Sequence, residues 1–579
     1  MNILGVNCYG HDASATLLVD GVPVCAVEEE RFIRQKHTGV FPENAIRCCL
    51  EMGNLKGSDL DAVGFYWDPG IHRLRQAAHV LRYWPASLNL LTARGDTARL
   101  LGGIKPALSR FLSVPESKIH YVEHHLAHAA SAFFVSPFDE AAIFSYDGVG
   151  EWTTTLYGAG AGNQMHKRGE VFFPHSLGDF YSMMTEYLGF HHSGGEGKIM
   201  GLSSYGDASR YYKVLRPLVR ILGDGQYRLD TSYLRYHTHG KKAWFSPKLV
   251  ELLGPAREPE SAMTERCQDI AAAAQRVVEE CALELLRWHH QQTRTPRLAI
   301  SGGVGLNSVV NGRIITETPF TELFIQPAAN DASGSFGAAF YLWNQVFKQP
   351  RQYVMTNAYL GPAIPDHQHR AAIEAEGLSY ETLSREDLVE RSAAMLAEGK
   401  IIGWFQGRME YGPRSLGNRS ILAAPFPASM KDTLNARVKH REPFRPFAPS
   451  LPAERVGEFF EHDYPSPFML LVYQTRPDKR AAIPAVDHVD GTGRVQSVVR
   501  EENPLFYDLI TRFGEKTGVP VLLNTSFNVR GEPIMHAPEQ ALDCFLGEDM
   551  DALVLGPHFL DKNHVPAAKR RAGGAKALD

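Results

Sequence analysis

The sequence predicts an α/β protein of at least two domains, on three observations. The chain has 579 residues, more than the roughly 250–300 at which a single core stops growing. A strand–turn–strand pattern at residues 2–29 recurs at residues 141–160. A long helical pattern at residues 265–292 leads into a buried-type strand at 298–301 and a glycine loop. Strands that alternate with helices are typical of α/β folds.

The elements follow in chain order. Strands are expected at residues 2–8, 15–20 and 22–29, and a second set at 141–146 and 153–157. The shared plan indicates a weak internal duplication. Polar residues and a proline at 348–352 interrupt the periodicity and predict a domain junction, with a second domain from about residue 355. Its landmarks are strands at 401–405 and 519–523.

Composition favours an ordinary globular protein, with 44% hydrophobic and 22% charged residues. A formal net charge of -5 gives no global attraction to nucleic acid or anionic membrane, although it permits a local phosphate pocket. The seven cysteines are scattered and show no C-x-x-C spacing. Because no signal-type segment and no long apolar run occurs, we expect a cytoplasmic protein that is neither secreted nor membrane-spanning.

The first candidate site is a histidine pair. His124 and His128 lie four residues apart in a helical, apolar stretch, so both imidazoles share one helix face and can bind one metal ion. Structural histidines satisfied by hydrogen bonds are the alternative. A metalloprotease of the H-E-x-x-H type is a poor interpretation, because His125 stands where that motif has glutamate.

Two aspartates extend the pair. Asp147 ends an apolar strand and precedes Gly148, and Asp331 follows a second strand. Alone, Asp147 would be a turn residue and Asp331 the cap of the next helix. With His124 and His128 they form a set of two nitrogen and two oxygen ligands suited to Fe(II), Zn(II) or Mn(II).

Three glycine-rich loops, at residues 147–150, 193–198 and 301–307, can present backbone N–H groups to phosphates. None of the three loops matches a Walker or Rossmann fingerprint, and each loop alone is typical of a tight turn. Together they suggest a nucleotide site. The side chains and glycines proposed to bind the nucleotide here are Gly148, Lys198, Gly302, Gly303, Asn307 and Asn311.

The second domain carries a basic region among Pro and Phe residues, which we interpret as an anion pocket because Arg forks bind phosphate bidentately. A solvated basic face is the alternative. The basic residues are Arg408, Arg414, Arg419, Arg437, Lys439, Arg441 and Arg445. Further donors come from Arg494, Asn524 and Asn528.

Along nearly its whole length the chain resembles the NodU/CmcH family of O-carbamoyltransferases. The matching segments are residues 11–15, 28–32 with Lys36 and His37, 124–130, 147–152, 198–206, 302–307, 412–417, 441–449 and 524–528. The stretches 68–114 and 207–257 match poorly, and we expect them to form the walls that bind the acceptor.

The resemblance implies a duplicated actin-like ATP-binding domain, residues 1–354, followed by a YrdC-like domain, residues 355–579. It implies that the second domain cleaves carbamoyl phosphate and joins the carbamate to ATP as carbamoyl-adenylate, releasing pyrophosphate. In the first domain a hydroxyl of a small-molecule natural product would then attack the carbonyl and AMP would leave. Such chemistry belongs to secondary metabolism, including antibiotic biosynthesis.

The resemblance also assigns roles. His11 matches the proposed general base, and a pKa near 6.5 suits proton removal at neutral pH. Lys36 and Asp147 complete the catalytic set. Iron(II) is the metal implied for His124, His128, Asp147 and Asp331, with Mg accompanying the nucleotide. Lys439 and Arg441 resemble the K-x-R signature of YrdC-like domains, which with Arg494 and Asn524 would bind phosphates.

Two alternatives share these features. A tRNA-modifying threonylcarbamoyl transferase uses the same two domain types, but the acidic net charge and the lack of a basic stripe argue against a nucleic-acid partner. A kinase-like actin-fold ATP binder would leave the C-terminal arginines without a purpose. The apolar helices are compatible with a homodimer.

Overall fold

The computed structural model describes residues 1–574 and consists of two compact units. Unit 1 comprises Met1–Glu29 and His37–Met355, and unit 2 comprises Glu30–Lys36 and the chain from Thr356 onward. Nothing in the sequence indicates that the short segment Glu30–Lys36 groups with the later residues. Across residues 1–574, no helix combines the length and the apolar character needed to cross a membrane.

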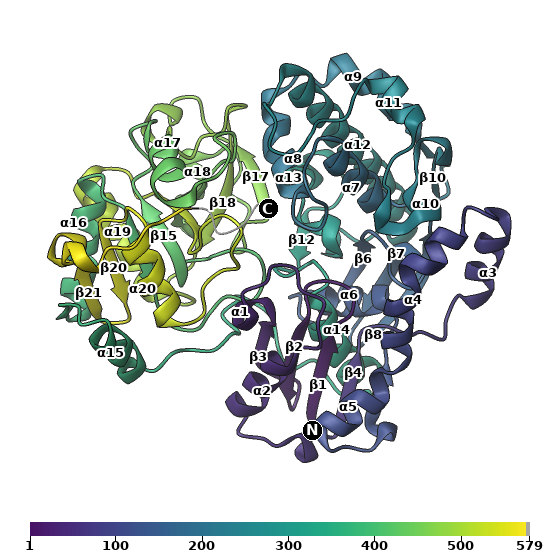
Figure 1. Ribbon diagram of the computed structural model, residues 1–579, viewed down its shortest axis with the longest axis horizontal. Coiled ribbons are helices and arrows are strands. Elements are labelled where there is room, and N and C mark those ends of the chain that lie inside the picture. Colours follow the sequence, from purple (N-terminus) through teal and green to yellow (C-terminus); the bar gives the residue numbers. More distant parts are fainter. Residues whose placement is uncertain (575–579) are drawn as a thin grey trace. The chain divides into compact units, whose positions relative to one another are not determined.

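Unit 1 contains two five-stranded sheets with one topology (Figure 1). The first has the order β3-β2-β1-β4-β5, and the second, read in the same sense, has the order β8-β7-β6-β11-β12. In each, the first strand pairs antiparallel with the second and parallel with the fourth. This repeat confirms the predicted duplication and the α/β, actin-like class.

The strands of unit 1 are β1 (Asn2–Asn7), β2 (Ser14–Val19), β3 (Val22–Glu28), β4 (Ala62–Phe65), β5 (Ile119–Tyr121), β6 (Glu140–Tyr146), β7 (Thr153–Ala161), β8 (Gln164–Phe172), β11 (Arg297–Ser301) and β12 (Glu322–Ile325), with a separate hairpin of β9 (Val219–Ile221) and β10 (Tyr227–Leu229). The central strands β1 and β6 are buried almost throughout. Their continuous apolar sequences therefore fit strands that are covered on both faces.

Two helices cross between the repeats. Helix α6 (His124–Phe133) follows β5 of the first repeat but packs on β6 and β11 of the second, while α14 (Ser333–Phe340) follows β12 and packs on β1 and β2. The two helices also pack on each other (Figure 1). A Cβ on Gly337 would lie only 1.7 Å from the carbonyl oxygen of Ala127, so the close approach requires glycine. The starts of both helices thereby reach the end of β6.

The remaining helices of unit 1 are α2 (Glu43–Met52), α3 (Arg73–Arg82), α4 (Leu88–Gly102), α5 (Ile104–Leu112), α7 (Leu177–Tyr187), α8 (Glu196–Leu202), α9 (Ser209–Leu215), α10 (Tyr236–His239), α11 (Pro247–Leu253), α12 (Glu265–Thr293) and α13 (Ser308–Glu317). Helix α12 matches the long helix predicted from residue 265. Its cap is Thr264, whose side chain accepts a hydrogen bond from the Cys267 amide.

Unit 2 is built on a nine-stranded mixed sheet of order β13-β21-β20-β14-β15-β19-β16-β18-β17. Its strands are β13 (Glu381–Thr382), β14 (Ile402–Phe405), β15 (Arg419–Ala423), β16 (Ala448–Pro452), β17 (Leu471–Gln474), β18 (Thr492–Val498), β19 (Leu522–Ser526), β20 (Ala552–Leu555) and β21 (His558–Asp561). Its helices are α1 (Glu30–Ile33), α15 (Asp366–Ala375), α16 (Arg385–Ala397), α17 (Met430–Leu434), α18 (Val456–Phe459), α19 (Pro504–Thr517) and α20 (Pro538–Gly547).

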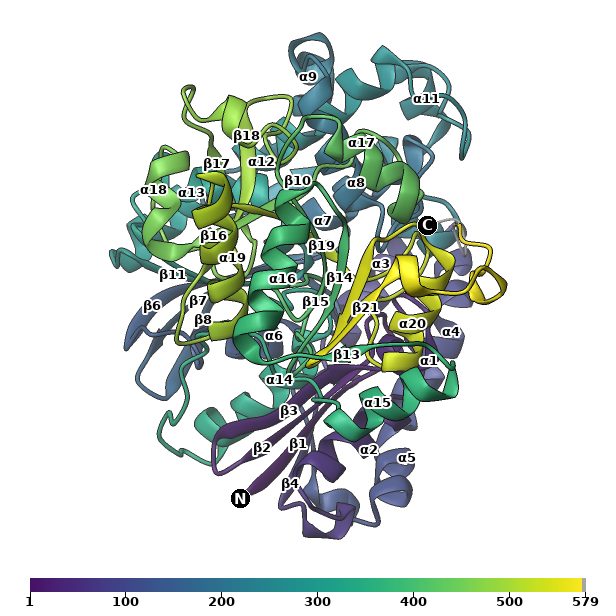
Figure 2. The same ribbon diagram turned by 90° about the vertical axis from the view of Figure 1, so that its left-hand side faces the viewer.

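The core of unit 2 lies between this sheet and helices α16 and α19, which run side by side along it (Figure 2). Leu396 of α16 and Phe513 of α19 are fully buried with Trp404 of β14. The indole of Trp404 donates to the Gly417 carbonyl oxygen at 3.0 Å. Since Gly417 has a φ of +108°, glycine suits this turn, which follows the loop that carries Arg414.

Candidate functional site

Four side chains that are distant in sequence converge in unit 1. His124 and His128 come from α6, Asp147 follows β6, and Asp331 lies just before α14. All four are buried, and their ligand atoms lie within 4.8 Å of one another. The Nε2 atom of His128 is 2.9 Å from Asp147 Oδ2 and 3.7 Å from Asp331 Oδ1. The structure therefore brings together the predicted ligand set.

The geometry fits a divalent cation. Ligands about 2.1 Å from a tetrahedral metal stand about 3.4 Å apart. The Nε2 atoms of His124 and His128 are 3.1 Å apart, and His124 Nε2 lies 3.5 Å from Asp147 Oδ2 and 3.8 Å from Asp331 Oδ1. The Nδ1 atom of His128 faces the Ser333 hydroxyl at 2.9 Å, which leaves Nε2 for a metal.

The charges of the cluster are tightly coupled. Burial lowers the pKa of His128, but hydrogen bonds to Asp147 and Asp331 and their charges outweigh burial and raise it to about 9. Burial raises the pKa of Asp147, yet the two histidines bring it well below its usual value. Without a metal, His128 therefore carries a proton at neutral pH, and its positive charge compensates part of the negative charge of the two aspartates.

The helix-cap role considered for Asp331 is wrong. The N-cap of α14 is Ala332, and no side chain caps that helix. The backbone oxygen of Asp331 instead accepts from Asn7 Nδ2 at 2.7 Å. This contact fixes the turn, so the Asp331 carboxylate remains directed at the histidines and at His11, whose Nε2 lies 3.7 Å from Asp331 Oδ2.

A buried glutamate that the sequence analysis did not single out holds the start of α6. Glu151 Oε1 accepts from the backbone amides of Asp68 at 2.7 Å and His124 at 3.0 Å. Burial raises the pKa of Glu151 to about 8. Nearby, a Cβ on Gly150 would lie 2.8 Å from the His124 ring, so the β6–β7 turn packs directly on this ligand.

His11 lies in the β1–β2 turn and is held by a carboxylate. Its Nδ1 is 2.8 Å from Asp12 Oδ2, while His37 Nδ1 is 2.7 Å from Asp12 Oδ1. Burial lowers the pKa of His11, whereas the charge of Asp331 and the contact with Asp12 raise it to about 9. The bridging carboxylate fixes the His11 ring, and Nε2 points to the metal cluster.

The glycine loops after β6 and β11 meet at Asp147. A Cβ on Gly303 would lie 2.9 Å from Asp147 Oδ1, and that oxygen accepts from the Gly148 amide at 2.7 Å. Gly302 has a φ of +92°, and a Cβ there would lie 2.3 Å from the Tyr146 carbonyl oxygen. Gly148, Gly302 and Gly303 thus bring backbone close to the cluster.

Three other predicted nucleotide residues have internal partners. Asn307 caps α13 by accepting from the Val310 amide at 3.1 Å, and its amide pairs with that of Gln275 through two 3.0 Å hydrogen bonds. Asn311 Nδ2 donates to the Gly305 carbonyl oxygen at 2.8 Å. Lys198 is buried on α8, with its ammonium 5.3 Å from the centre of the Phe190 ring. The two asparagines consequently shape the loop before α13.

Unit 2 gathers a second set of predicted residues around an arginine cluster. Burial, then the charges of Arg414, Arg441 and Arg445, lower the pKa of Arg494 well below its usual value. Burial and Arg445 lower the pKa of Arg414 to about 10. The Nε atoms of Arg414 and Arg494 are buried without a hydrogen-bond partner among residues 1–574. Such a concentration of positive charge is suited to a polyanion.

Lys439 fixes the chain beside this cluster. Its ammonium donates to the backbone oxygens of Ser526 and Asn528 at 2.8 and 2.6 Å and to Asn528 Oδ1 at 2.7 Å. Burial and neighbouring positive groups, Lys36 among them, lower the pKa of Lys439. Lys36 ends the segment Glu30–Lys36, which belongs to unit 2. Asn524 Nδ2 donates to Gln496 Oε1 at 3.0 Å, while its own Oδ1 is buried without a described partner.

Three arginines of the predicted basic region have other partners. Arg408 donates to the carbonyl oxygens of Leu360 and Gly361. Arg419 donates to the backbone of the loop that follows β14 and stacks on Phe405 at 3.7 Å. Arg437 pairs with Asp549 at 2.6 Å. These three side chains support the fold of unit 2.

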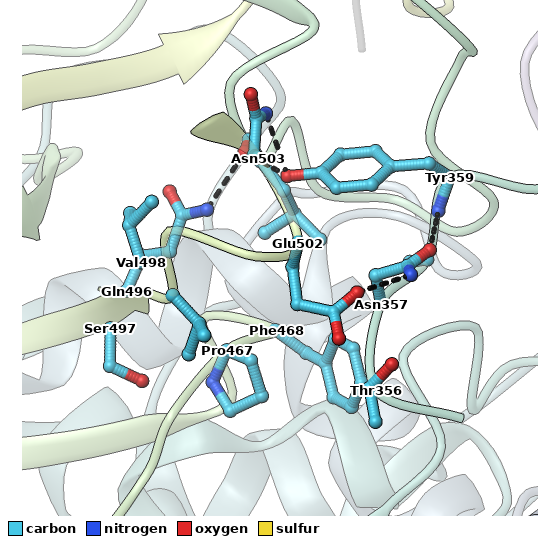
Figure 3. A pocket seen from close by; sticks show the side chains of 13 residues that line it. Thr356, Asn357, Tyr359, Pro467, Phe468, Gln496, Ser497, Val498, Glu502 and Asn503 are labelled. Atoms are coloured by element: carbon cyan, nitrogen blue, oxygen red, sulfur yellow. Dashed lines mark hydrogen bonds between the residues drawn. The ribbon is translucent and has the colours of Figure 1, made fainter. Parts of the chain in front are cut away.

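A small pocket in unit 2 lies next to Asn524 (Figure 3). Gln496 lines it and also bonds Asn524. Most of its polar groups pair internally: Asn357 donates to Glu502 at 2.6 Å, and Asn503 donates to the Tyr359 hydroxyl at 3.0 Å. The pocket wall therefore supports the strand that carries Arg494.

The coupled protonation predicts how metal binding depends on pH. His128 must lose its proton to bind a metal, and its pKa is about 9. The affinity of the metal-free protein for Zn(II) should rise about tenfold per pH unit from pH 6.5 and level off near pH 9. Competition with a chelator at several pH values measures this slope. An affinity that does not change over this range would contradict a proton shared within the cluster.

Replacing Glu151 tests its hold on α6. Glu151→Ala leaves the buried amide of His124 and the half-buried amide of Asp68 without an acceptor, and should destabilise the protein by about 1–3 kcal/mol and weaken Zn(II) binding. Glu151→Gln, which keeps an oxygen for both amides, should retain most of both properties. Urea unfolding and Zn(II) titration provide the comparison, with Glu140→Ala, at the exposed start of β6, as the control. Equal losses in the Ala and Gln variants would disprove this positioning role.

Comparison with known proteins identifies the family. Residues 2–340 match the carbamoyltransferase N-terminus model, and residues 393–562 match the carbamoyltransferase C-terminus model. An uncharacterised protein of Synechocystis sp. is 40% identical over 98% of this chain and 97% of its own length. The nodulation protein NolNO of Sinorhizobium fredii is 36% identical, over 96% of this chain and 80% of its own.

A relative that is named for its enzymatic activity also matches. The 3'-hydroxymethylcephem-O-carbamoyltransferase of Streptomyces clavuligerus is 33% identical over 58% of this chain and 59% of its own length. The two family models together span both structural units. This chain accordingly belongs to the NodU/CmcH-type carbamoyltransferase family, and the enzyme transfers carbamoyl groups.

Proposed function

We propose that the enzyme is an ATP-dependent O-carbamoyltransferase that makes carbamoyl-adenylate in unit 2 and transfers the carbamoyl group to a hydroxyl of a small-molecule natural product in unit 1. In this proposal residues 1–354 form the carbamoyl-transfer domain, and residues 355–579 form the YrdC-like domain that makes the adenylate. ATP, carbamoyl phosphate and a hydroxylated acceptor are the proposed substrates, and the cytoplasm is the proposed location.

The observation that carries the proposal is the arginine cluster of unit 2. Half-buried guanidinium groups that repel one another, and whose Nε atoms are buried without a partner, are costly unless an anion compensates them. Arg414 and Arg494 have no acidic partner among the described residues, and their main charged neighbours are arginines. Carbamoyl phosphate and the triphosphate of ATP supply the missing negative charge.

The proposed formation of carbamoyl-adenylate in unit 2 has two steps. Water attacks the phosphorus of carbamoyl phosphate, the bond between that phosphorus and the bridging oxygen breaks, and carbamate and inorganic phosphate are formed. A carbamate oxygen attacks the α-phosphorus of ATP, a new P–O bond forms, and pyrophosphate leaves with the bonding electrons. Arg414, Arg441 and Arg494 would neutralise the phosphates, and Lys439 would hold the β19 loop beside them.

The transfer step uses the residues of unit 1. The acceptor oxygen forms a bond to the carbamoyl carbon, the bond from that carbon to the AMP oxygen breaks, and His11 Nε2 takes the hydroxyl proton. Asp12 orients His11 through Nδ1. His124, His128, Asp147 and Asp331 would hold a divalent cation, which would supply Lewis-acid stabilisation of the departing phosphate charge. The charge of Asp331 raises the pKa of His11, so a cation that neutralised this carboxylate would favour the basic form of His11.

The backbone near the cluster suits the nucleotide. Gly148, whose amide donates to Asp147 Oδ1, and Gly303, which packs against the same oxygen, bring backbone to the place where an adenylate phosphate would bind. Iron(II) is the proposed metal because the ligand set combines imidazole with carboxylate, and zinc and manganese suit the same set. Mg would accompany ATP in unit 2.

Removing one guanidinium of the arginine cluster should suppress the first reaction. Arg494→Gln should lower carbamoyl phosphate-dependent pyrophosphate release at least tenfold, about the loss expected for one charge-assisted contact. Arg500→Gln provides a matched control, because the Arg500 side chain is 63% exposed. A pyrophosphate assay measures the rate. Unchanged release by the Arg494 variant, or ADP as the nucleotide product of the wild type, would contradict carbamoyl-adenylate formation in unit 2.

Removing a metal ligand should uncouple the two reactions. Asp331→Ala leaves unit 2 intact, so pyrophosphate release should continue while carbamoyl transfer falls at least 100-fold, as is typical when a ligand of a catalytic metal is lost. Mass spectrometry of hydroxylated natural products detects the carbamoyl increment. Equal loss of pyrophosphate release and transfer would contradict separate sites for the two reactions.

A further inference from the structure

Helix α3, at the edge of unit 1 (Figure 1), turns its apolar face to solvent. Four apolar residues follow the spacing i, i+3, i+4, i+7 and form one stripe along the helix: Leu74, Ala77, Ala78 and Leu81. All four are exposed, Leu74 by 88% and Leu81 by 76%. Trp84, just past the end of the helix, is 60% exposed. A stripe with this spacing normally packs on a protein core, so its exposure indicates a surface for another partner.

The opposite side of α3 is polar and holds the helix to the rest of unit 1. His79 Nε2 donates to the His237 carbonyl oxygen at 2.7 Å. Gln76 Nε2 donates to the Glu151 carbonyl oxygen at 3.5 Å. Both donors lie on the side of the helix away from the apolar stripe, because each residue turns the helix by about 100°. These contacts fix the orientation in which the apolar stripe faces outward.

Arginines border the apolar stripe. Arg75 and Arg82, seven residues apart, flank it on one side, and Arg73 flanks it on the other. The sequence contains no acidic residue between Asp68 and Asp96. In the part of the chain that the structure describes, none of these three arginines forms an ion pair with a carboxylate. The exposed surface of α3 is therefore apolar along its centre and positively charged at its edges.

A second copy of this chain is a poor partner for this surface. A two-fold axis would place the surface against itself, so arginines of one copy would face arginines of the other with no carboxylate of the segment between them. A bilayer with anionic lipids satisfies both parts of the surface. Its phosphates suit arginine forks, its acyl chains accept leucine, and tryptophan prefers the boundary between the two.

We propose that α3 docks the protein on an anionic phospholipid surface, with Leu74, Leu81 and Trp84 inserted among the lipids and Arg73 and Arg82 bound to their phosphates. The helix has 10 residues, half of the roughly 20 needed to span a bilayer, so it lies in the plane of the interface. Because salt screens charges beyond about 10 Å, the local charge of α3 governs the attraction, and the net charge of -5 has little effect. Docking does not depend on the proposed carbamoyl transfer.

Vesicle sedimentation tests the assignment. The full-length protein should sediment with vesicles of equal parts phosphatidylglycerol and phosphatidylcholine, and it should remain in the supernatant with vesicles of phosphatidylcholine alone. Leu74→Gln/Leu81→Gln removes the large side chains of the stripe, and Arg73→Gln/Arg82→Gln removes two of its charges. Each double variant should weaken binding to the anionic vesicles at least tenfold.

Matched controls come from unit 2. Val489→Gln and Arg500→Gln change an apolar and a basic residue that are 62% and 63% exposed, and both should bind the vesicles as the wild type does. All variants should keep the circular dichroism spectrum and urea midpoint of the wild type, because the replaced side chains are exposed. Loss of vesicle binding then reports the surface of α3 and not unfolding.

Four results would overturn the proposal. The wild type could fail to sediment with anionic vesicles, or bind both kinds of vesicle equally. Folded variants of the stripe or of its arginines could bind as tightly as the wild type. Finally, light scattering without lipid could show a wild-type dimer that Leu74→Gln/Leu81→Gln converts to a monomer, which would assign the apolar stripe to a second copy of the chain.

Discussion

The mutual repulsion of two buried carboxylates, Asp147 and Asp331, is the constraint on which the rest of unit 1 depends. Two anions in a low-dielectric environment require positive charge close by. His124 and His128 supply part of it, and the proposed divalent cation would supply the remainder. The crossed helices α6 and α14 bring the histidines and Asp331 to Asp147. Each helix starts beside the end of β6, and each packs on the sheet of the other repeat.

The two units carry charged sites of opposite kind. Unit 1 concentrates acceptors for a cation, and unit 2 concentrates donors for anions around Arg414 and Arg494. In both, the charged groups are held by backbone contacts: Glu151 holds the start of α6, and Lys439 holds the end of β19. Ligand charge then contributes to the stability of each site as well as to its chemistry.

The duplication and the convergence of the proposed metal ligands were predictable because their signals are local. Strand–turn–strand patterns recur in the sequence, and His124 and His128 share a helix face by spacing alone. Partners made by tertiary folding were not. In the sequence Glu151 is only one residue of a turn, and its role depends on the packing of α6 against it. Asp331 does not cap α14, because its buried carboxylate interacts with the histidines instead. The grouping of Glu30–Lys36 with unit 2 has no sequence signal, because it depends on contacts far along the chain, such as that of Arg31 with the Gly412 carbonyl oxygen.

The central claim is that His124, His128, Asp147 and Asp331 hold one divalent cation. Anomalous diffraction from crystals of the purified enzyme, recorded on both sides of the iron and zinc absorption edges, tests it most directly. We expect one peak per chain, about 2.0–2.3 Å from a nitrogen of each histidine and an oxygen of each aspartate. A cation bound elsewhere, or four side chains that point apart in a crystal supplied with metal, would contradict the account.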